Sequence, residues 1–521
     1  MNKDLNKVND LNQSIEPVKD ADAKGAVSIE GSNLYEVDDK MEALIEAADL
    51  DGKVPEAEPQ RQYYFIKKAR RYMDELAKEI GRRPRACSVA FGCQMNARDS
   101  EKILGVLKAV GYEETESEKA EFVIYNTCTV RDNADQRVYG RLGYAGSLKK
   151  KNPHMRIGVC GCMMQEQVAV DKIRKSYRQV DLIFGTHNLF KFAELLCSMF
   201  ESDRMIIDIW KETNEIVEDL PVARKYPFKS GVNITFGCDN FCTYCIVPYV
   251  RGRERSRDPK DIVREVERLA ADGVKEVMLL GQSLNSYGTG LPEDKKISFA
   301  KLLEEVCKVE GIERVRFMTP HPKDLSQELI DVIKNNPKVA RHIHLPLQSG
   351  STEILRRMNR KYTREQYLEL ALRIRREIPD AAITTDIIVG FPGETNEDVD
   401  DTIDIVKQVK YDNAFTFIYS KRTGTPAATF ETKLSDEEVK HNFDRLLKVV
   451  QETAHAQSAR FNDTDQRVLV ESLNEQDETL VTGRMSNNTL VHFKGGEELI
   501  GQFVDVHLDE CKGFYFIGHM I

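Results

Sequence analysis

The chain has 521 residues, 41% of them hydrophobic, which suits about three domains of ~150 residues each and excludes a wholly disordered protein. No signal-peptide core opens the sequence and no run of eighteen apolar residues occurs, so we expect a soluble cytoplasmic protein without a membrane partner. The net charge is −10, and the eleven cysteines favour metal or redox chemistry over a disulfide framework, because the cytosol is reducing.

The charge is unevenly distributed along the chain. Residues 1–60 carry 6 basic and 15 acidic side chains, and residues 460–521 carry 5 and 11, so the middle of the chain is basic. Residues 1–60 also hold hardly any aromatic side chains, and we expect an acidic disordered tail there. The spacing of residues 61–84 predicts one amphipathic leading helix that ends at a Gly-Arg-Arg-Pro sequence.

Short apolar runs then alternate with helical stretches over residues 85–205. The runs ACSVAFG, EFVIYNT and MRIGVCG are each followed by a helical pattern, and VDLIFG adds a fourth. This alternation predicts an N-terminal α/β domain with a parallel sheet and crossover helices.

The alternation resumes at residues 224–458 and ends in a different pattern. Six apolar runs, each followed by a helical stretch, predict a (βα)6 partial or full barrel whose chemistry lies at the carboxyl ends of its strands. Residues 459–521 instead alternate with a period of two over five short runs, which predicts a small closed β-barrel of the oligonucleotide-binding (OB) kind.

Three cysteines follow the first strand of the predicted barrel with the spacing CxxxCxxC: Cys238, Cys242 and Cys245. Three thiolates can hold three irons of a four-iron cluster (4Fe-4S) and leave one iron open for a small chelating molecule. The amino and carboxylate groups of S-adenosylmethionine (SAM) fit such an iron, and cleavage of SAM would yield a 5′-deoxyadenosyl radical. The alternative, a zinc loop with a distant fourth ligand, is disfavoured because zinc knuckles occur on small β folds.

A second set of cysteines is dispersed along the N-terminal sheet. Cys93, Cys128 and Cys162 follow three successive strands, so we expect them at one edge of the sheet, where binding crevices form. They predict a second 4Fe-4S cluster with its own open iron, although any one of them taken singly is equally explained as a core cysteine. The others are interpreted as structural: Cys87, Cys160, Cys197, Cys307 and Cys511.

Several motifs carry a specific resemblance. CTYCIVPYVRGRERSR, GQSLNSYG, HLPLQSGS, TDIIVGFPGET and AFTFIYSKRTGTPAA, with GCQMN, NTCTVR and GCM, resemble the radical SAM methylthiotransferases, particularly those acting on isopentenyladenosine in tRNA. The similarity runs from about Cys87 to Ile521 and implies a methylthiotransferase N-terminal domain, a radical SAM barrel and a C-terminal TRAM domain. It further implies that Cys93, Cys128 and Cys162 hold an auxiliary cluster that supplies or carries sulfur, while one SAM gives the methyl group and a second the radical.

The resemblance also suggests cofactor contacts and partners. Gln282, Gln348 and Asp386 are candidates for binding SAM, and Tyr244 for packing near its adenine. Each of these residues taken singly is equally explained as a group that holds neighbouring loops together by hydrogen bonds. The expected partners are a tRNA anticodon stem-loop, an electron donor such as flavodoxin or ferredoxin, and a sulfur source.

Basic residues supply candidate contacts with RNA phosphates. The first run comprises Arg251, Arg253, Arg255 and Arg257, and the second comprises Arg356, Arg357, Arg360 and Lys361. The acidic C-terminal barrel conflicts with RNA binding unless one face gathers Arg467, Arg484 and Lys494, or bases stack on Phe493.

Two kinds of alternative remain open at this point. The methylthio acceptor is alternatively threonylcarbamoyladenosine in tRNA or a ribosomal protein side chain, although NTCTVRDNA with RGRERSR favours the isopentenyladenosine branch. A non-enzymatic alternative is an iron–sulfur scaffold or electron carrier with an RNA-binding domain, which leaves the six βα units with SAM-type loops unexplained.

Overall fold

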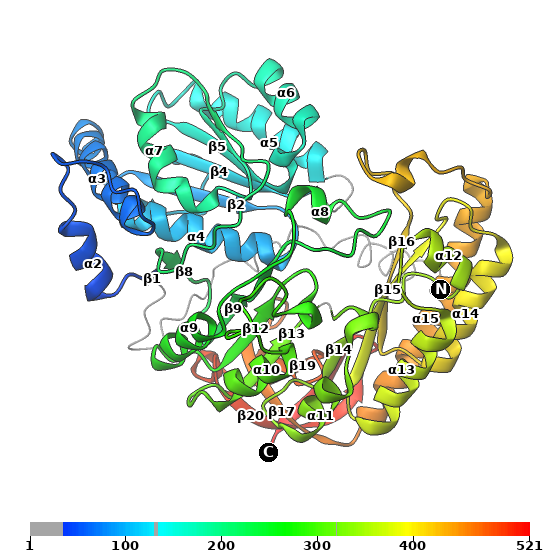
Figure 1. Ribbon diagram of the computed structural model, residues 1–521. Coiled ribbons are helices and arrows are strands. Elements are labelled where there is room, and N and C mark those ends of the chain that lie inside the picture. Colours follow the sequence, from blue (N-terminus) through cyan, green and yellow to red (C-terminus); the bar gives the residue numbers. More distant parts are fainter. Residues whose placement is uncertain (1–34, 130–133, 319) are drawn as a thin grey trace.

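The computed structural model describes residues 35–129, 134–318 and 320–521 (Figure 1). The prediction of a disordered tail is wrong for residues 35–60. Strand β1 (Tyr35–Glu36) pairs with β8 (Val222–Ala223), and helix α2 (Asp39–Glu46), capped by Asp38, packs on α3 (Gln60–Ile80). The acidic composition hid two apolar side chains four residues apart, Met41 and Ile45, which are both buried. Residues 1–34 lie outside the described part, so that portion of the tail stays a prediction.

The N-terminal sheet is entirely parallel, as predicted, with the strand order β3-β2-β4-β5-β6-β7. Every residue of β4 is buried, because helices cover both faces of the sheet. Short strands β3 and β7 were not expected. The strands are β2 (Arg85–Ala90), β3 (Glu113–Glu114), β4 (Phe122–Thr127), β5 (Arg156–Gly161), β6 (Leu182–Phe184) and β7 (Ile206–Asp208), and the helices are α4 (Gln94–Val110), α5 (Ala134–Lys149), α6 (Gln167–Ser176) and α7 (Phe192–Phe200).

The central domain contains the six predicted parallel strands, arranged as the sheets β13-β12-β9 and β14-β15-β16. A bridge between Val315 and Val339 links the two halves into a partial barrel. Capping boxes begin helices α13, α14 and α15. The strands are β9 (Lys229–Asn233), β12 (Glu276–Leu280), β13 (Arg314–Phe317), β14 (His342–His344), β15 (Ala382–Val389) and β16 (Asn413–Ile418), and the main helices are α9 (Pro259–Ala271), α10 (Phe299–Lys308), α11 (Gln327–Asn335), α12 (Thr352–Arg357), α13 (Arg364–Glu377), α14 (Asn396–Val409) and α15 (Asp436–Ser458).

The C-terminal residues form the predicted closed barrel in the order β17-β18-β19-β21-β20. Phe493 is fully buried in its core, so the hypothesis that bases stack on this ring is wrong. Arg467 and Arg484 form ion pairs within the protein, Arg467 with Glu313 and Arg484 with Glu471. The strands are β17 (Asp465–Leu473), β18 (Leu480–Met485), β19 (Leu490–Lys494), β20 (Phe503–Cys511) and β21 (Tyr515–Met520).

The C-terminal barrel docks against the starting ends of the central strands (Figure 1). Arg314 donates to the carbonyl of Arg484 at 2.9 Å, and Arg316 donates to that of Met485 at 2.7 Å. The opposite ends of the strands, where a barrel of this kind carries its chemistry, are thereby left to the N-terminal domain.

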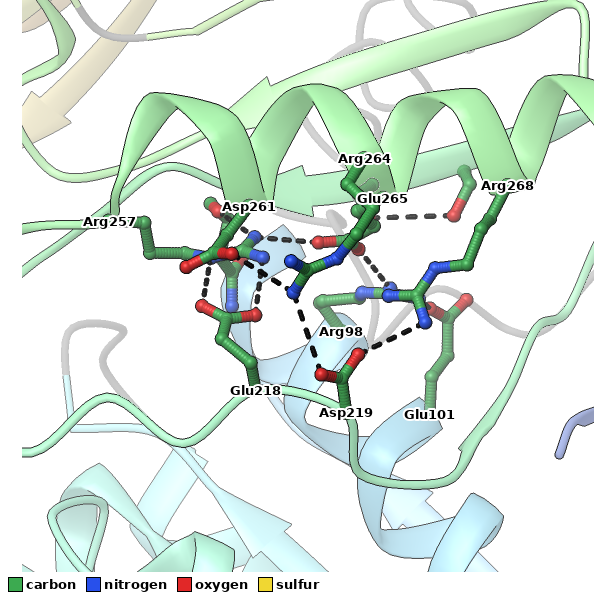
Figure 2. A network of polar contacts seen from close by, with 12 residues as sticks. Arg98, Glu101, Glu218, Asp219, Arg257, Asp261, Arg264, Glu265 and Arg268 are labelled. Carbon is green, nitrogen blue, oxygen red and sulfur yellow. Dashed lines mark hydrogen bonds and ion pairs between the residues drawn. The ribbon is translucent and has the colours of Figure 1, made fainter. Parts of the chain in front are cut away.

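An ion-pair network joins the N-terminal domain to the central one (Figure 2). Glu265 of α9 accepts from Arg98 of α4 at 2.8 Å and from Arg257 at 2.6 Å. Arg257 also pairs with Glu218, in the segment that connects the two domains, at 2.6 Å. These contacts fix α4, which starts at the first cysteine of the dispersed set, against the barrel. No helix among the described residues is long and apolar enough to cross a bilayer.

Candidate active site

The CxxxCxxC cysteines lie on a loop between β10 (Thr235–Phe236) and α8 (Val247–Val250). Gly237 opens this loop with a φ of 74°, and a Cβ there would lie 2.2 Å from the carbonyl oxygen of Arg253, so the turn requires glycine. The amide of Cys245 donates to the carbonyl of Cys242 at 2.9 Å. Cys238 and Cys242 are buried and Cys245 is half-buried.

Polar side chains surround these sulfurs. Asn240 Nδ2 lies 3.4 Å from Cys238 Sγ, and the buried Arg360 donates to Cys242 Sγ at 3.5 Å. Burial, with Cys242 nearby, raises the pKa of Cys245 to about 12. Binding of a metal to this sulfur would release a proton.

The dispersed cysteines meet at one edge of the N-terminal sheet, as the strand pattern predicted. Cys93 caps α4 after β2, Cys128 follows β4, and Cys162 opens a 3₁₀ turn (Cys162–Gln165) after β5. Asn96 Oδ1 joins two of them, lying 3.7 Å from Cys93 Sγ and 3.9 Å from Cys162 Sγ. Gly92 approaches the third so closely that a Cβ would lie 2.7 Å from Cys128 Sγ.

The two cysteine sets face each other across the domain boundary. Cys162 packs with Ile246 and Val250 in one apolar cluster; Ile246 directly follows the CxxxCxxC motif and Val250 ends helix α8. Thr186 adds a polar contact by donating to the carbonyl of Val250 at 2.6 Å. The carboxyl edge of the N-terminal sheet therefore packs against the segment that follows the CxxxCxxC motif at the barrel mouth.

Arg251 crosses this boundary from the barrel side. Its guanidinium pairs with Asp99 at 2.7 Å and donates to Asn96 Oδ1 at 2.7 Å and to Cys162 Sγ at 3.2 Å. Burial raises the pKa of Cys162 to about 12, and Arg251 opposes that rise. The prediction that Arg251 binds RNA is wrong, because its side chain is buried and used within the protein.

The other arginines of that run also differ from expectation. Arg257 is buried in the network of Figure 2, which excludes it from phosphate contact. Arg255 is half-buried and donates to the carbonyl of Thr213 at 2.9 Å. Arg253, by contrast, remains available for phosphate contact, since its side chain is 70% exposed; it pairs with Asp239 at 2.9 Å. In the second run, Arg360 is buried beside Cys242, whereas Lys361 is exposed.

The candidate SAM residues lie at or beyond the carboxyl halves of the barrel strands. Gln282 follows β12, contacts Met95 of the N-terminal domain, and keeps a buried Oε1 without a hydrogen-bond partner. Gln348 has a φ of 69°, and its amide donates to the carbonyl of Asp386 at 2.8 Å. Asp386 Oδ2 lies 3.2 Å from His344 Nε2, and Tyr244 packs edge-on against Phe391.

Two residues at the boundary were missed by the sequence reasoning. Asn96, in the FGCQMNAR segment, contacts both Cys93 and Cys162, and its position three residues after a candidate ligand was the only available signal. His187 is buried with both ring nitrogens unpartnered, and burial, with Arg255 and Arg251 nearby, lowers its pKa to about 4. Nothing in the sequence distinguished this histidine from a core residue.

No three His, Cys, Asp or Glu side chains of the described ranges converge on a single metal-ion position. A four-iron cluster has a different requirement, because each thiolate binds its own iron and the sulfurs surround the cluster.

Comparison with known proteins gives three family matches in chain order. Residues 85–185 match the uncharacterized protein family UPF0004, residues 232–406 match the radical SAM superfamily, and residues 460–521 match the TRAM domain. Among solved structures, the chain is similar to the radical S-adenosylmethionine methyltransferase TsrM from Kitasatospora setae. The TM-score is 0.48 at 13% identity, over 66% of this chain and 74% of that one.

Full-length relatives are far more similar. The tRNA-2-methylthio-N(6)-dimethylallyladenosine synthase of Lachnoclostridium phytofermentans is 60% identical over 86% of this chain and 98% of its own. The enzyme of the same name from Clostridioides difficile is 47% identical over 90% of this chain and 98% of its own length. N(6)-dimethylallyladenosine is the nucleoside also called isopentenyladenosine, so these relatives agree with the branch that the motifs indicated. The chain belongs to the family of tRNA-2-methylthio-N(6)-dimethylallyladenosine synthases, which are radical SAM methylthiotransferases.

Proposed function

We propose that the two cysteine sets hold two 4Fe-4S clusters, and that the chain thereby converts isopentenyladenosine next to the anticodon of tRNA to its 2-methylthio derivative. Cys238, Cys242 and Cys245 hold the radical SAM cluster. Cys93, Cys128 and Cys162 hold the auxiliary cluster. The observation that carries the proposal is the packing of Cys162 against Ile246 and Val250, because it brings the auxiliary cysteine set against the segment that follows the CxxxCxxC motif.

The residues present fit such groups. Each set offers three sulfurs, which leaves one iron of a four-iron cluster open. The close approach of Gly92 to Cys128 leaves no space for a side chain beside that sulfur. The unpartnered Oε1 of Gln282 is an acceptor available to a ligand at the barrel mouth.

When bound, the barrel cluster with SAM supplies a radical that activates an aromatic C–H bond, and the auxiliary cluster supplies or carries the sulfur. The chain's own residues hold and orient these groups. Arg360 donates toward Cys242, and Asn96, which accepts from Arg251, lies beside Cys93 and Cys162. Gln282, Gln348 and Asp386 line the barrel side where SAM binds, and Tyr244 packs beside them. An external reductant such as flavodoxin or ferredoxin and a sulfur source complete the reaction.

The tRNA anticodon stem-loop approaches the same mouth. Three cations from three loops converge around the Asp239–Asn240 turn: Arg253 pairs with Asp239, Lys323 donates to Asn240 Oδ1 at 2.8 Å, and Lys361 donates to Asn359. Asn359 in turn donates to the carbonyl of Asn240 at 3.2 Å. Exposed cations gathered in this way suit phosphate contacts.

Iron analysis of the anaerobically reconstituted protein tests the proposal. We expect about eight irons in the wild type and about four after Cys238, Cys242 and Cys245 are replaced together by alanine, with all SAM cleavage lost. The matched variant lacking Cys93, Cys128 and Cys162 should also keep about four irons, yet still cleave SAM to 5′-deoxyadenosine. Loss of all iron, or of none, in either triple variant would contradict two independent clusters.

A further inference from the structure

Arg251 reaches the auxiliary cysteine set from the other domain. It follows directly after α8, six residues beyond Cys245, and is only 6% exposed. Its three side-chain contacts are all made with the N-terminal domain, namely with Asp99, Asn96 and the sulfur of Cys162. The radical SAM loop therefore contributes a polar group to a cluster site built by another part of the chain.

The guanidinium suits this task because its donors form a rigid planar fork. Nη1 faces Asp99 and Nη2 faces Asn96, both at 2.7 Å, which leaves Nε directed at Cys162 Sγ at 3.2 Å. Asn96 also lies 3.7 Å from Cys93 Sγ. Of the three sulfurs, the one to which Arg251 donates directly is therefore that of Cys162.

We propose that Arg251 is a positioning residue that hydrogen-bonds the Cys162 thiolate of the auxiliary cluster and raises that cluster's reduction potential. Reduction adds negative charge to a cluster, and a hydrogen-bond donor or a cation beside a ligand sulfur stabilises the more negative state. This inference rests on the proposed function, since it requires Cys162 to be a cluster ligand.

The arrangement links the cluster's redox state to domain docking. Because Arg251 is attached to the CxxxCxxC loop and Cys162 to the N-terminal sheet, the hydrogen bond exists only while the two domains are in contact. The auxiliary cluster therefore has its working potential only when it faces the barrel mouth.

The test measures the auxiliary cluster alone, in full-length protein whose barrel cysteines Cys238, Cys242 and Cys245 are alanine. Into this parent we would introduce Arg251→Gln, Arg251→Lys or, as the matched control, Arg253→Gln, which alters an exposed arginine two residues away. Iron content, thermal unfolding and the midpoint potential from an EPR-monitored titration are recorded for each.

In Arg251→Gln, with four irons bound, we expect the one-electron equilibrium to shift about tenfold toward the oxidised cluster, a potential about 59 mV more negative. Arg251→Lys keeps the charge but lacks the fork, so its shift should be smaller, and Arg253→Gln should not shift. If both Arg251 variants fail to bind iron but unfold at the same temperature as the parent protein, that result would also support a role of Arg251 in positioning Cys162.

Other outcomes overturn the proposal. An unchanged potential in Arg251→Gln with four irons bound excludes the hydrogen-bond role. Loss of iron together with a lowered unfolding temperature in both Arg251 variants makes Arg251 a residue of the fold alone. If the parent itself binds no iron, it is the proposed function that fails, so the two failures are distinguishable.

Discussion

Cys160 and Cys162 are separated by one residue, and strand alternation alone would place both on the same face of the sheet. The structure separates them through Gly161, whose φ of 98° turns the chain away from β5. Any larger residue there would clash, because a Cβ would lie 2.4 Å from the carbonyl oxygen of Thr127. Cys160 consequently stays in the apolar core, while Cys162 reaches the domain boundary.

The different surroundings of Cys128 and Cys160 lead to a prediction about sulfur insertion. Replacing Cys128 by alanine removes one of three proposed auxiliary ligands and should abolish methylthiolation, while SAM cleavage continues without product. The loss should be nearly complete, because the cluster is a reactant and not a contributor of a few kcal/mol to a barrier. Mass spectrometry of digested isopentenyl-tRNA, beside chromatography of 5′-deoxyadenosine, measures both quantities.

Cys160→Ala is the matched control on the neighbouring strand. Its side chain packs in the core without contacting the other sulfurs, so this variant should keep its activity and lose about 1 kcal/mol of stability or slightly more. Methylthio product from the Cys128→Ala protein, or none from Cys160→Ala, would show that the auxiliary ligands are assigned wrongly.

At the scale of elements, the sequence predicted the main strands of all three domains because buried parallel strands and short barrel strands have distinct apolar patterns. It failed where a local pattern was masked by overall composition. Helix α2 lies in an acidic segment, and its buried face against α3 consists of Met41 and Ile45. Strand β7 is an edge strand of only three residues, which is too short to show a periodic pattern.

Helix α2 leads to a prediction from two truncations. Deleting residues 1–50 removes β1 and α2, and it exposes the α3 surface that Met41 and Ile45 cover. Burial of two such side chains contributes about 3 to 6 kcal/mol to stability. The unfolding temperature of the N-terminal domain should therefore fall clearly. The control is deletion of residues 1–34 only. It should leave the unfolding temperature unchanged and turnover on tRNA within about twofold of the wild type, as expected for an acidic tail.

These truncations are followed by differential scanning calorimetry and by turnover. Equal unfolding temperatures for the two proteins would mean that α2 contributes no stability. A large fall in turnover on removal of residues 1–34, with folding intact, would assign those residues a role that their composition does not indicate.

At the scale of the whole molecule, the sequence predicted three domains and two cysteine sets but not how the domains meet. The boundary depends on single polar side chains, such as Arg98, Arg251 and Glu265, which follow no periodic pattern and whose partners lie up to 167 residues away. Arg251 and Arg257 were assigned to RNA for this reason, because a basic run in sequence looks the same whether it is solvated or buried between domains.

Glu265 is the centre of that boundary, and its removal should uncouple the two halves of the reaction. In Glu265→Gln the side chain keeps its size but no longer offsets the charges of Arg98 and Arg257, which lie at 2.8 and 2.6 Å. Breaking a buried pair in this way costs about 3 to 5 kcal/mol. We expect α4 and its cysteine to dock less firmly on the barrel, so limited proteolysis should cut the connecting segment around Glu218 faster. The ratio of 5′-deoxyadenosine to methylthio product should rise severalfold.

Glu305→Gln provides the comparison, because Glu305 pairs with Lys308 on the exposed face of α10 and such exposed pairs contribute little. That protein should match the wild type in proteolysis rate and in product ratio. Iron content decides what a positive result means: Glu265→Gln should still bind about eight irons, since the network touches none of the six proposed ligand sulfurs. A wild-type product ratio in Glu265→Gln, with faster proteolysis, would show that docking through α4 is not what couples radical formation to sulfur insertion. Loss of iron instead would mean that the network maintains the cluster sites themselves.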